Sequence, residues 1–248
     1  GTTIFITYMV LSNFPQLITF QGDGSLPITL ALDLVIAMPI SWWPLISDYN
    51  RFSKSEKGAF LGTVAGYTFA NSWFYALGAL LVLAYASQTI ISAIVSITFG
   101  GFALAILLVD ETDNGFADIY SGAVSIQNIF PKIKQWKLIA IITVISIFIA
   151  ASVPQDWQTT YESFLLSIGG IFVPLLGVLA VDFYIVRKKQ YGLEEFYSSA
   201  RVLKVKPIIS WFIGIIAYFT LYNYTSWGSS IPSFIVAAAT LYLLEKVS

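Results

Sequence analysis

Long apolar stretches, separated by short polar segments, constrain the fold of this chain more than any other feature. Eight stretches can be marked, and they run approximately over Thr3–Phe20, Ile28–Ile46, Ala59–Tyr85, Ile90–Ile126, Leu138–Ser152, Phe164–Val186, Ile208–Tyr222 and Pro232–Leu244. A helix needs about 20 apolar residues to cross the hydrocarbon core of a bilayer. The chain is 57% apolar and 11% charged, whereas soluble domains are about 45–50% apolar and about 25% charged. The sequence therefore predicts an all-α, polytopic membrane protein with eight transmembrane helices.

The basic residues predict how these helices are oriented. The 13 lysines and arginines follow the second, fourth, sixth and eighth stretches, as Arg51, Lys54, Lys57, Lys132, Lys134, Lys137, Arg187, Lys188, Lys189, Arg201, Lys204, Lys206 and Lys246. The alternate loops, Gln21–Pro27, Ala86–Thr89, Val153–Thr160 and Asn223–Ile231, contain no basic residue. Because cytoplasmic loops carry an excess of Lys and Arg, both chain ends are expected on the cytoplasmic side. We expect a multi-pass protein of the cell (plasma or inner) membrane, embedded in the lipid bilayer.

The absence of two residue types limits the catalytic and metal-binding sites that this chain can form. The sequence contains no Cys and no His. Disulfide scaffolds and thiolate metal sites are therefore excluded, and the commonest general base is absent. No tract is basic enough for nucleic-acid binding. We expect no enzymatic activity and no bound organic cofactor.

The second stretch contains an interruption signal at Ala37–Pro44. Pro39 and Pro44 each lack a backbone donor and clash with a preceding carbonyl. In lipid, a freed backbone group must find a partner or line a cavity. Interrupted helices of transporters bind substrates and ions in this way. The alternative is a simple proline kink without a chemical role.

The fourth stretch combines apolar length with a cluster of carboxylates: Asp110, Glu111, Asp113 and Asp118. Carboxylates at membrane depth usually face a cavity or a partner. On a helix, Asp110, Asp113 and Asn114 share one face. Thr112 and Asp113 offer hard oxygen ligands suited to coupling with Na⁺ or H⁺. An extramembrane loop over Asp110–Gly115 is the alternative, but it would place the following lysines on the wrong side of the membrane, so the charge pattern favours one long helix.

Two further carboxylates are expected to be structural. Asp33 lies near the start of the second stretch, and Asp182 lies near the end of the sixth. We expect each to be interfacial or paired with nearby Arg and Lys side chains.

Several motifs resemble the purine–cytosine permease, or nucleobase–cation symporter, family. Ser41–Phe52 resembles the end of that family's sixth helix, and Asp113–Ser121 resembles its eighth. Asp182–Arg187 resembles the end of its tenth helix. Asn223–Tyr224 with Ser230–Ser233 resembles the junction of its last two helices. The motifs follow the family's order and spacing, and the branch of hydroxymethylpyrimidine permeases is the most similar.

The resemblance implies a fold of twelve helices, ten of which form a five-plus-five inverted repeat, with two extra carboxyl-terminal helices. This chain, residues 1–248, would be a single transmembrane transporter domain matching helices five to twelve. The amino-terminal helices of the same protein would be missing partners, so the chain is expected to begin inside a longer protein.

The resemblance also implies binding residues. The cation ligands fall on the Val109 carbonyl, Thr112 and Asp113, for Na⁺ or H⁺. The position that hydrogen-bonds the base falls on Asp118, where the family often has Asn. Asn114 is expected to line the substrate site from the same helix.

On the sixth helix of the family, the ring-stacking position falls on Pro39, which is not aromatic. Trp42, three residues further on, is the expected substitute. Met38, Pro39, Ser41 and Trp42 are therefore the predicted substrate-lining residues of this segment.

These observations predict secondary active transport, as cation-coupled symport, of a nucleobase-like heterocycle such as cytosine, hydroxymethylpyrimidine or a related purine or hydantoin. An amino-acid or other small-solute transporter of the same inverted-repeat fold is an alternative, against which the acidic Asp118 argues. An intramembrane enzyme would need paired carboxylates or His for acid–base work. Asp110, Asp113 and Asp118 offer a metal site, but no His supports it.

Overall fold

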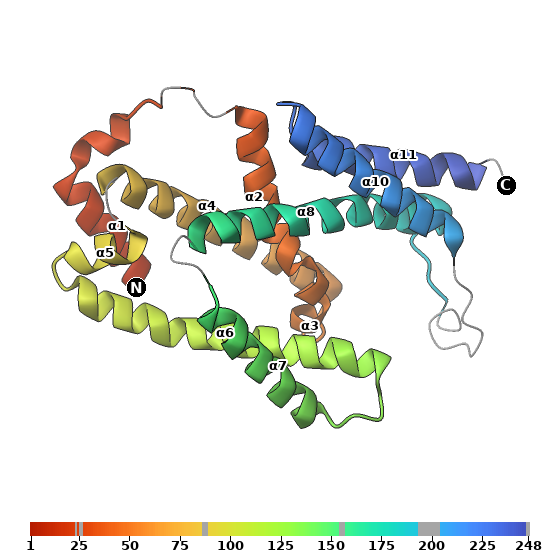
Figure 1. Cartoon of the computed structure of the whole chain (residues 1–248), viewed down its shortest axis with the longest axis horizontal. Helices are drawn as coiled ribbons and strands as arrows, with labels where there is room; N and C mark the ends of the chain where they lie inside the picture. Colours follow the sequence, from red (N-terminus) through yellow and green to blue (C-terminus); the bar gives the residue numbers. More distant parts are fainter. Residues whose placement is uncertain (23, 25–26, 86–88, 154–156, 193–203, 247–248) are drawn as a thin grey trace. The chain divides into compact units, whose positions relative to one another are not determined.

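The structure is a computed structural model of the whole chain, and it describes all residues except 23, 25–26, 86–88, 154–156, 193–203 and 247–248 (Figure 1). Across the described residues, every regular element is a helix. The prediction of an all-α protein is therefore confirmed. Arg201 and parts of three predicted non-basic loops lie outside the described residues.

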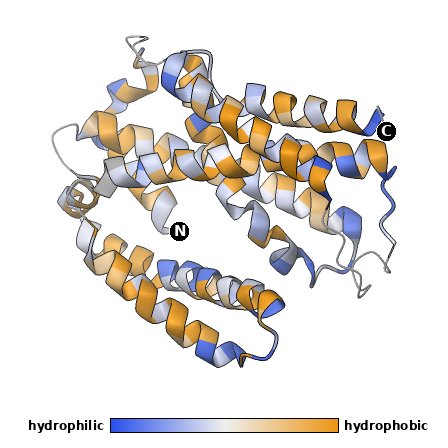
Figure 2. Cartoon of the chain, turned by 45° about the vertical axis from the view of Figure 1, so that its right-hand side comes forward, coloured by the Kyte–Doolittle hydropathy of each residue, from blue (hydrophilic) through white to orange (hydrophobic). Residues whose placement is uncertain are grey.

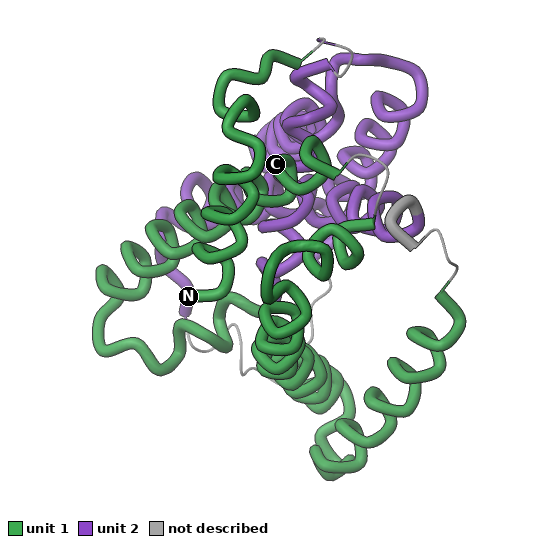
Figure 3. The backbone as a smooth tube through the Cα atoms, turned by 90° about the vertical axis from the view of Figure 1, so that its left-hand side faces the viewer, with its two compact units in different colours: residues 1–23, 45–153 green, residues 24–44, 154–248 purple. Residues whose placement is uncertain are grey.

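The chain divides into two compact units, coloured separately in Figure 3. Unit 1 comprises residues 1–23 and 45–153, and unit 2 comprises residues 24–44 and 154–248. Each unit is described by itself below. That the two act as one transporter domain stays a prediction.

Unit 1 contains an apolar cluster that some of its helices share. Its elements are α1 (Thr2–Asn13), η1 (Pro15–Thr19), α3 (Ile46–Asn50), α4 (Glu56–Ala84), α5 (Ile90–Ser96), α6 (Gly100–Ile129) and α7 (Gln135–Ala151). Ile6 and Val10 of α1 pack with Leu77 and Leu81 of α4 and with Ala103 of α6. Pro15 explains why α1 stops at Asn13, because the residue before a proline disfavours helical backbone. The first predicted stretch is thus a short helix followed by a 3₁₀ turn.

The fourth predicted stretch is two helices and not one. α5 ends at Ser96, and α6 begins at Gly100 after Phe99, which adopts a left-handed backbone with φ 60°. A β-carbon disfavours this conformation, and the turn redirects the chain. The expectation of one continuous helix over Ile90–Ile126 is therefore wrong at its start. The segment Asp110–Gly115 is helical, as predicted, and is not a loop.

Unit 2 is built around α8. Its elements are α2 (Ile28–Trp42), α8 (Trp157–Val181), the π-helical turn η3 (Asp182–Val186), α10 (Val205–Tyr224) and α11 (Ser230–Lys246). α8 lies against α2, α10 and α11. Gly177 of α8 permits the close approach of α11, because a β-carbon there would lie 2.4 Å from the Phe234 carbonyl oxygen. Small residues at such contacts are typical of membrane helix pairs.

Among the described residues, four helical segments are long and apolar enough to cross a membrane: Ile28–Asn50, Glu56–Ala84, Thr160–Val186 and Val205–Tyr224. Hydrophobic residues cover most of the helices in Figure 2. α6 has 30 residues, or about 45 Å at about 1.5 Å per residue, which exceeds the hydrocarbon core of about 30 Å. A polytopic helical membrane protein is confirmed, while the count of eight spans stays a prediction.

Candidate functional site

The interruption of the second stretch lies at its second proline. α2 continues through Pro39 to Trp42, and a 3₁₀ turn over Trp43–Leu45 then leads into α3. The prediction of an interrupted helix is confirmed, but Pro39 itself is accommodated inside α2. Pro44 lies in the 3₁₀ turn, where the missing N–H and the ring clash disrupt the regular helix.

The predicted substrate-lining residues of α2 lie just before this interruption. Met38, Pro39, Ser41 and Trp42 are all half-buried. The Ser41 hydroxyl donates to the Met38 carbonyl at 2.6 Å, which satisfies it locally. The Tyr161 hydroxyl of α8 lies 3.7 Å from the Met38 sulfur. The segment is therefore held against α8 while retaining exposed surface.

Two of the three predicted cation ligands are brought together on α6. The Thr112 hydroxyl donates to the Val109 carbonyl oxygen at 2.6 Å, so these two oxygens are neighbours. Asp113 follows directly and is exposed, as are Val109 and Thr112. In the described residues, no three Asp or Glu side chains gather closely enough to hold a metal ion.

The remaining α6 candidates are placed differently. The Asn114 side-chain amide donates to Glu111 at 3.1 Å, so its carbonyl oxygen is left as an acceptor. Asp118 lies within electrostatic range of Tyr49 on α3 and Tyr67 on α4. Sequence reasoning missed these two tyrosines. For Tyr49, the Asp-Tyr-Asn-Arg-Phe motif in which it lies was the available signal.

The end of α3 is tied to its neighbours in unit 1. The Thr63 hydroxyl of α4 donates to the Asn50 side-chain oxygen at 3.1 Å. The Arg51 guanidinium donates to the Tyr120 hydroxyl of α6 at 3.3 Å. These bonds fix the segment that carries Tyr49 relative to the helix that carries Asp118.

The predicted site residues are divided between the two units. Met38, Pro39, Ser41 and Trp42 belong to unit 2, and Val109, Thr112, Asp113, Asn114 and Asp118 belong to unit 1. The structure arranges each set within its own unit. That the two sets form one binding site stays a prediction.

Asp33 caps the start of α11. Its carboxylate oxygens accept hydrogen bonds from the backbone N–H groups of Ser229 at 2.7 Å and Ser230 at 2.8 Å. Asp33 is only 2% exposed. The structural role expected for Asp33 is therefore confirmed, but its partners are backbone N–H groups and not Arg or Lys side chains. A carboxylate is favoured here because a helix amino terminus presents unpaired N–H groups and positive partial charge.

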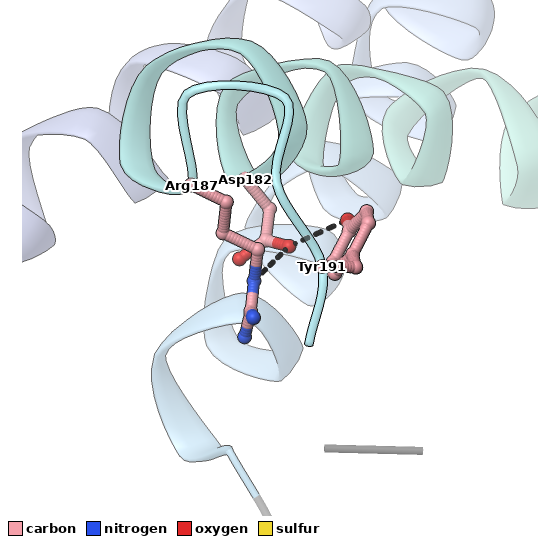
Figure 4. A network of polar contacts seen from close by, with 3 residues as sticks. All are labelled: Asp182, Arg187 and Tyr191. Atoms are coloured by element: carbon pink, nitrogen blue, oxygen red, sulfur yellow. Dashed lines mark hydrogen bonds and ion pairs between the residues drawn. The ribbon is translucent and has the colours of Figure 1, made fainter. Parts of the chain in front are cut away.

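Asp182 is paired as expected. Figure 4 shows the Arg187 guanidinium donating to its carboxylate at 2.9 Å and the Tyr191 hydroxyl donating to the same oxygen at 2.8 Å. The guanidinium also lies 4.9 Å from the centre of the Tyr191 ring. This network closes the π-helical turn at the end of α8, and its role is structural.

The helices and their polar interruptions define a multi-pass membrane protein with the features of a solute permease. The family described as "Permease for cytosine/purines, uracil, thiamine, allantoin" matches residues 9–244. The chain belongs to this family, and the resemblance noted from its motifs is confirmed. The specific likeness to hydroxymethylpyrimidine permeases stays a prediction.

One curated relative is the "Allantoin permease" of Bacillus subtilis (strain 168). It is 23% identical over 220 residues, covering 80% of this chain and 40% of that protein. The chain therefore spans about two-fifths of the length of this relative. No solved structure matches the chain significantly.

Proposed function

We propose that the chain is part of a secondary active transporter that moves a nucleobase-like heterocycle across the cell membrane by cation-coupled symport. The observation that carries this proposal is the permease-family match over residues 9–244. Both the family and the named relative are permeases, which agrees with a transporter and not with an enzyme. The intramembrane-enzyme alternative therefore has no support from the comparisons.

The substrate is proposed to bind to polar side chains of the interrupted helix α2 and of the acidic helix α6. Asp118 accepts N–H donors from the heterocycle, and Asn114 offers its free carbonyl oxygen. Trp42 supplies a flat ring for stacking, and Met38 and Ser41 complete the wall contributed by α2. Cytosine, hydroxymethylpyrimidine, purines and hydantoins all present the N–H edges that such acceptors recognise.

The coupling cation is proposed to bind at the Val109 carbonyl, Thr112 and Asp113. The 2.6 Å contact between the Thr112 hydroxyl and the Val109 carbonyl supports this assignment, because it places two hard oxygen ligands side by side. The Asp113 carboxylate supplies negative charge one residue further along. Na⁺ favours such oxygen ligands, while H⁺ would bind at Asp113 alone.

The carboxylates of α6 support the proposal that further helices of the same protein cover it. Asp110, Glu111 and Asp113 are exposed in unit 1, and an ionised side chain facing lipid is costly. The chain covers 40% of the relative's length. The order of the family motifs supports placing the chain at helices five to twelve, the carboxyl-terminal two-thirds of a twelve-helix fold, and the basic residues support placing both ends on the cytoplasmic side.

A thermal-shift panel tests the substrate class on the intact transporter. Cytosine, hydroxymethylpyrimidine, a purine and a hydantoin are each added to purified protein at saturating concentration, with an amino acid as the control ligand. At least one heterocycle is expected to raise the unfolding temperature, because a ligand that binds only the native state stabilises it. Stabilisation by the amino acid and by none of the heterocycles would contradict the proposal.

A further inference from the structure

A polar cavity lies at one end of unit 2, where α2, α8 and α11 begin and α10 ends. Its volume is about 380 Å³, within the range of about 300–1,000 Å³ typical of small-molecule sites. The lining residues that matter here are Asp33, Leu166, Glu162, Tyr222, Asn223 and Ser226. We call this cavity the outer pocket. A smaller cavity of about 160 Å³ shares Leu166 and Tyr222 with it.

The wall of the outer pocket is rich in hydrogen-bond acceptors. Asp33 and Glu162 contribute carboxylates, and among the residues that the structure describes no Lys or Arg lines the pocket. The Asn223 side-chain amide donates to the Phe219 carbonyl at 2.7 Å, which leaves its oxygen as a further acceptor. Tyr222 adds an aromatic ring. Such a wall complements a flat ligand that carries N–H donors.

The wall is held by polar contacts, of which those to Asp33 are buried and that of Thr29 is exposed. Besides the two N–H bonds to Asp33, the Thr29 hydroxyl donates to the Ser226 carbonyl at 2.7 Å. Gly228 has a φ of 80°, and a β-carbon there would lie 3.1 Å from the Thr29 carbonyl oxygen. The loop between α10 and α11 is thus fixed against α2. A wall that is already ordered binds a ligand with less loss of conformational entropy.

Two buried hydroxyl groups lie beside the pocket and interact with each other. Tyr218, which lines the smaller cavity, is 0% exposed, and Ser230 is 1% exposed. Both lie near Asp33, since Ser230 donates its N–H to that carboxylate and Tyr218 is within its electrostatic range. The Ser230 hydroxyl lies within hydrogen-bonding range of the Tyr218 hydroxyl, although the pair does not meet strict hydrogen-bond geometry in the part of the chain that the structure describes. Buried polar groups are nearly always satisfied, and these two hydroxyls extend the polar character of the region around Asp33.

The electrostatics favour a neutral ligand over an alkali cation. Asp33 already accepts two N–H bonds at the amino terminus of α11. α2 and α8 also begin at this end of the unit, and helix amino termini carry positive partial charge. These groups offset the two carboxylates without removing their capacity to accept hydrogen bonds.

We propose that the outer pocket is a second binding site, which takes a neutral heterocycle or ureide rich in N–H donors. The ligand class rests on the proposed function, while the site itself rests on the cavity and its wall. Asp33 precedes Met38 by five residues on α2, or about 7.5 Å along the helix. The outer pocket therefore lies beside the predicted substrate segment, on the side with no basic loops. Ligand held there is positioned for transfer to Met38–Trp42.

Equilibrium binding of radiolabelled allantoin to the purified intact transporter tests this proposal. Wild-type protein is expected to bind two equivalents of allantoin. Asp118→Ala is expected to retain only the equivalent in the outer pocket, and Glu162→Gln is expected to retain only the equivalent at the substrate site proposed above. Glu162 is exposed, so its substitution leaves folding intact, which thermal unfolding verifies. We expect the affinity of the outer site to fall at least tenfold in Glu162→Gln. Glu56→Gln, which removes an exposed carboxylate from the start of α4, is the matched control and is expected to bind as the wild type.

The outcomes separate the two proposals. One equivalent in the wild type, unchanged in Glu162→Gln, overturns the outer pocket and leaves the proposed function standing. The wild type could instead bind one equivalent that is lost in Glu162→Gln and retained in Asp118→Ala. If no uptake is detected as well, this result supports the outer pocket and overturns the proposed function. Glu162-dependent stabilisation by NaCl without allantoin binding makes the pocket a cation site and overturns the inference. Absence of allantoin binding and of any such stabilisation overturns it as well.

Discussion

Asp33→Asn tests how the interrupted helix is fastened within unit 2. The carboxylate accepts two backbone N–H bonds, at 2.7 Å and 2.8 Å, in an interior where Asp33 is 2% exposed. Asparagine keeps one oxygen acceptor but presents an NH₂ group to the second N–H. One charge-assisted hydrogen bond is lost, which is worth about 1.5–3 kcal/mol, and a buried donor is left unsatisfied, which costs about 1–3 kcal/mol.

We therefore expect Asp33→Asn to lower the free energy of unfolding by about 2–4 kcal/mol, less than the sum of the two, because the lost bond and the orphaned donor partly overlap. The assay is denaturant titration of the purified protein in detergent, followed by far-UV circular dichroism. Glu56→Gln, which changes an exposed carboxylate at the start of α4, is the control and is expected to shift the free energy by less than about 1 kcal/mol. A loss below 1 kcal/mol for Asp33→Asn would refute the argument that this carboxylate joins α2 to α11.

Three further predictions concern other parts of the chain. Thr112→Ala removes a hydroxyl ligand and is expected to raise the cation concentration for half-maximal uptake at least fivefold, while Thr112→Ser keeps the wild-type value. Equal cation dependence in the wild type and both variants would refute Thr112 as a cation ligand. Gly177→Ala places a β-carbon 2.4 Å from the Phe234 carbonyl oxygen and is expected to destabilise the protein by about 1–3 kcal/mol through overpacking, as measured by denaturant titration. Asp182→Asn is expected to destabilise the protein by about 1–2 kcal/mol, because the ion pair with Arg187 is charge-assisted and largely buried. Since salt screens ion pairs, the difference in unfolding free energy from the wild type should shrink in 1 M NaCl. An undiminished difference would argue against an electrostatic origin.

The sequence predicted the helices well where the signal was local. Apolar length and proline position are properties of neighbouring residues, so α4, α8 and α10 coincide with predicted stretches. The charge pattern also correctly indicated that Asp110–Gly115 is helical. The resemblance of short motifs led to the family that the comparison then showed.

The errors arose where tertiary contacts decide the structure. Pro39 was expected to interrupt its helix, yet α2 continues to Trp42. The separation of α5 from α6 was different, because a local signal was present and was not used. Gly100 and Gly101 directly follow the left-handed Phe99, a Gly-Gly pair is a turn signal, and a β-carbon at Gly100 would clash with the Ile94 carbonyl oxygen. Asp33 is satisfied by N–H groups about 196 residues further along the chain, and a partner at that distance leaves no trace in the neighbouring sequence.

The candidate site was predictable only in part for the same reason. Val109 and Thr112 are three residues apart on one helix, so their contact follows from helical spacing alone. Tyr49 and Tyr67 lie near Asp118 because α3, α4 and α6 belong to one unit. That proximity depends on how three helices pack, which sequence periodicity does not specify.

Uptake of a labelled heterocycle by the intact transporter in proteoliposomes tests the central claim most directly. Cytosine, allantoin and hydroxymethylpyrimidine are offered under an inward Na⁺ gradient, an inward H⁺ gradient and no gradient. The account predicts gradient-dependent accumulation of at least one compound, abolished by Asp118→Ala and retained by Asp110→Ala, with both variants inserted normally. Accumulation that persists unchanged in Asp118→Ala, or no accumulation of any heterocycle under either gradient, would contradict it.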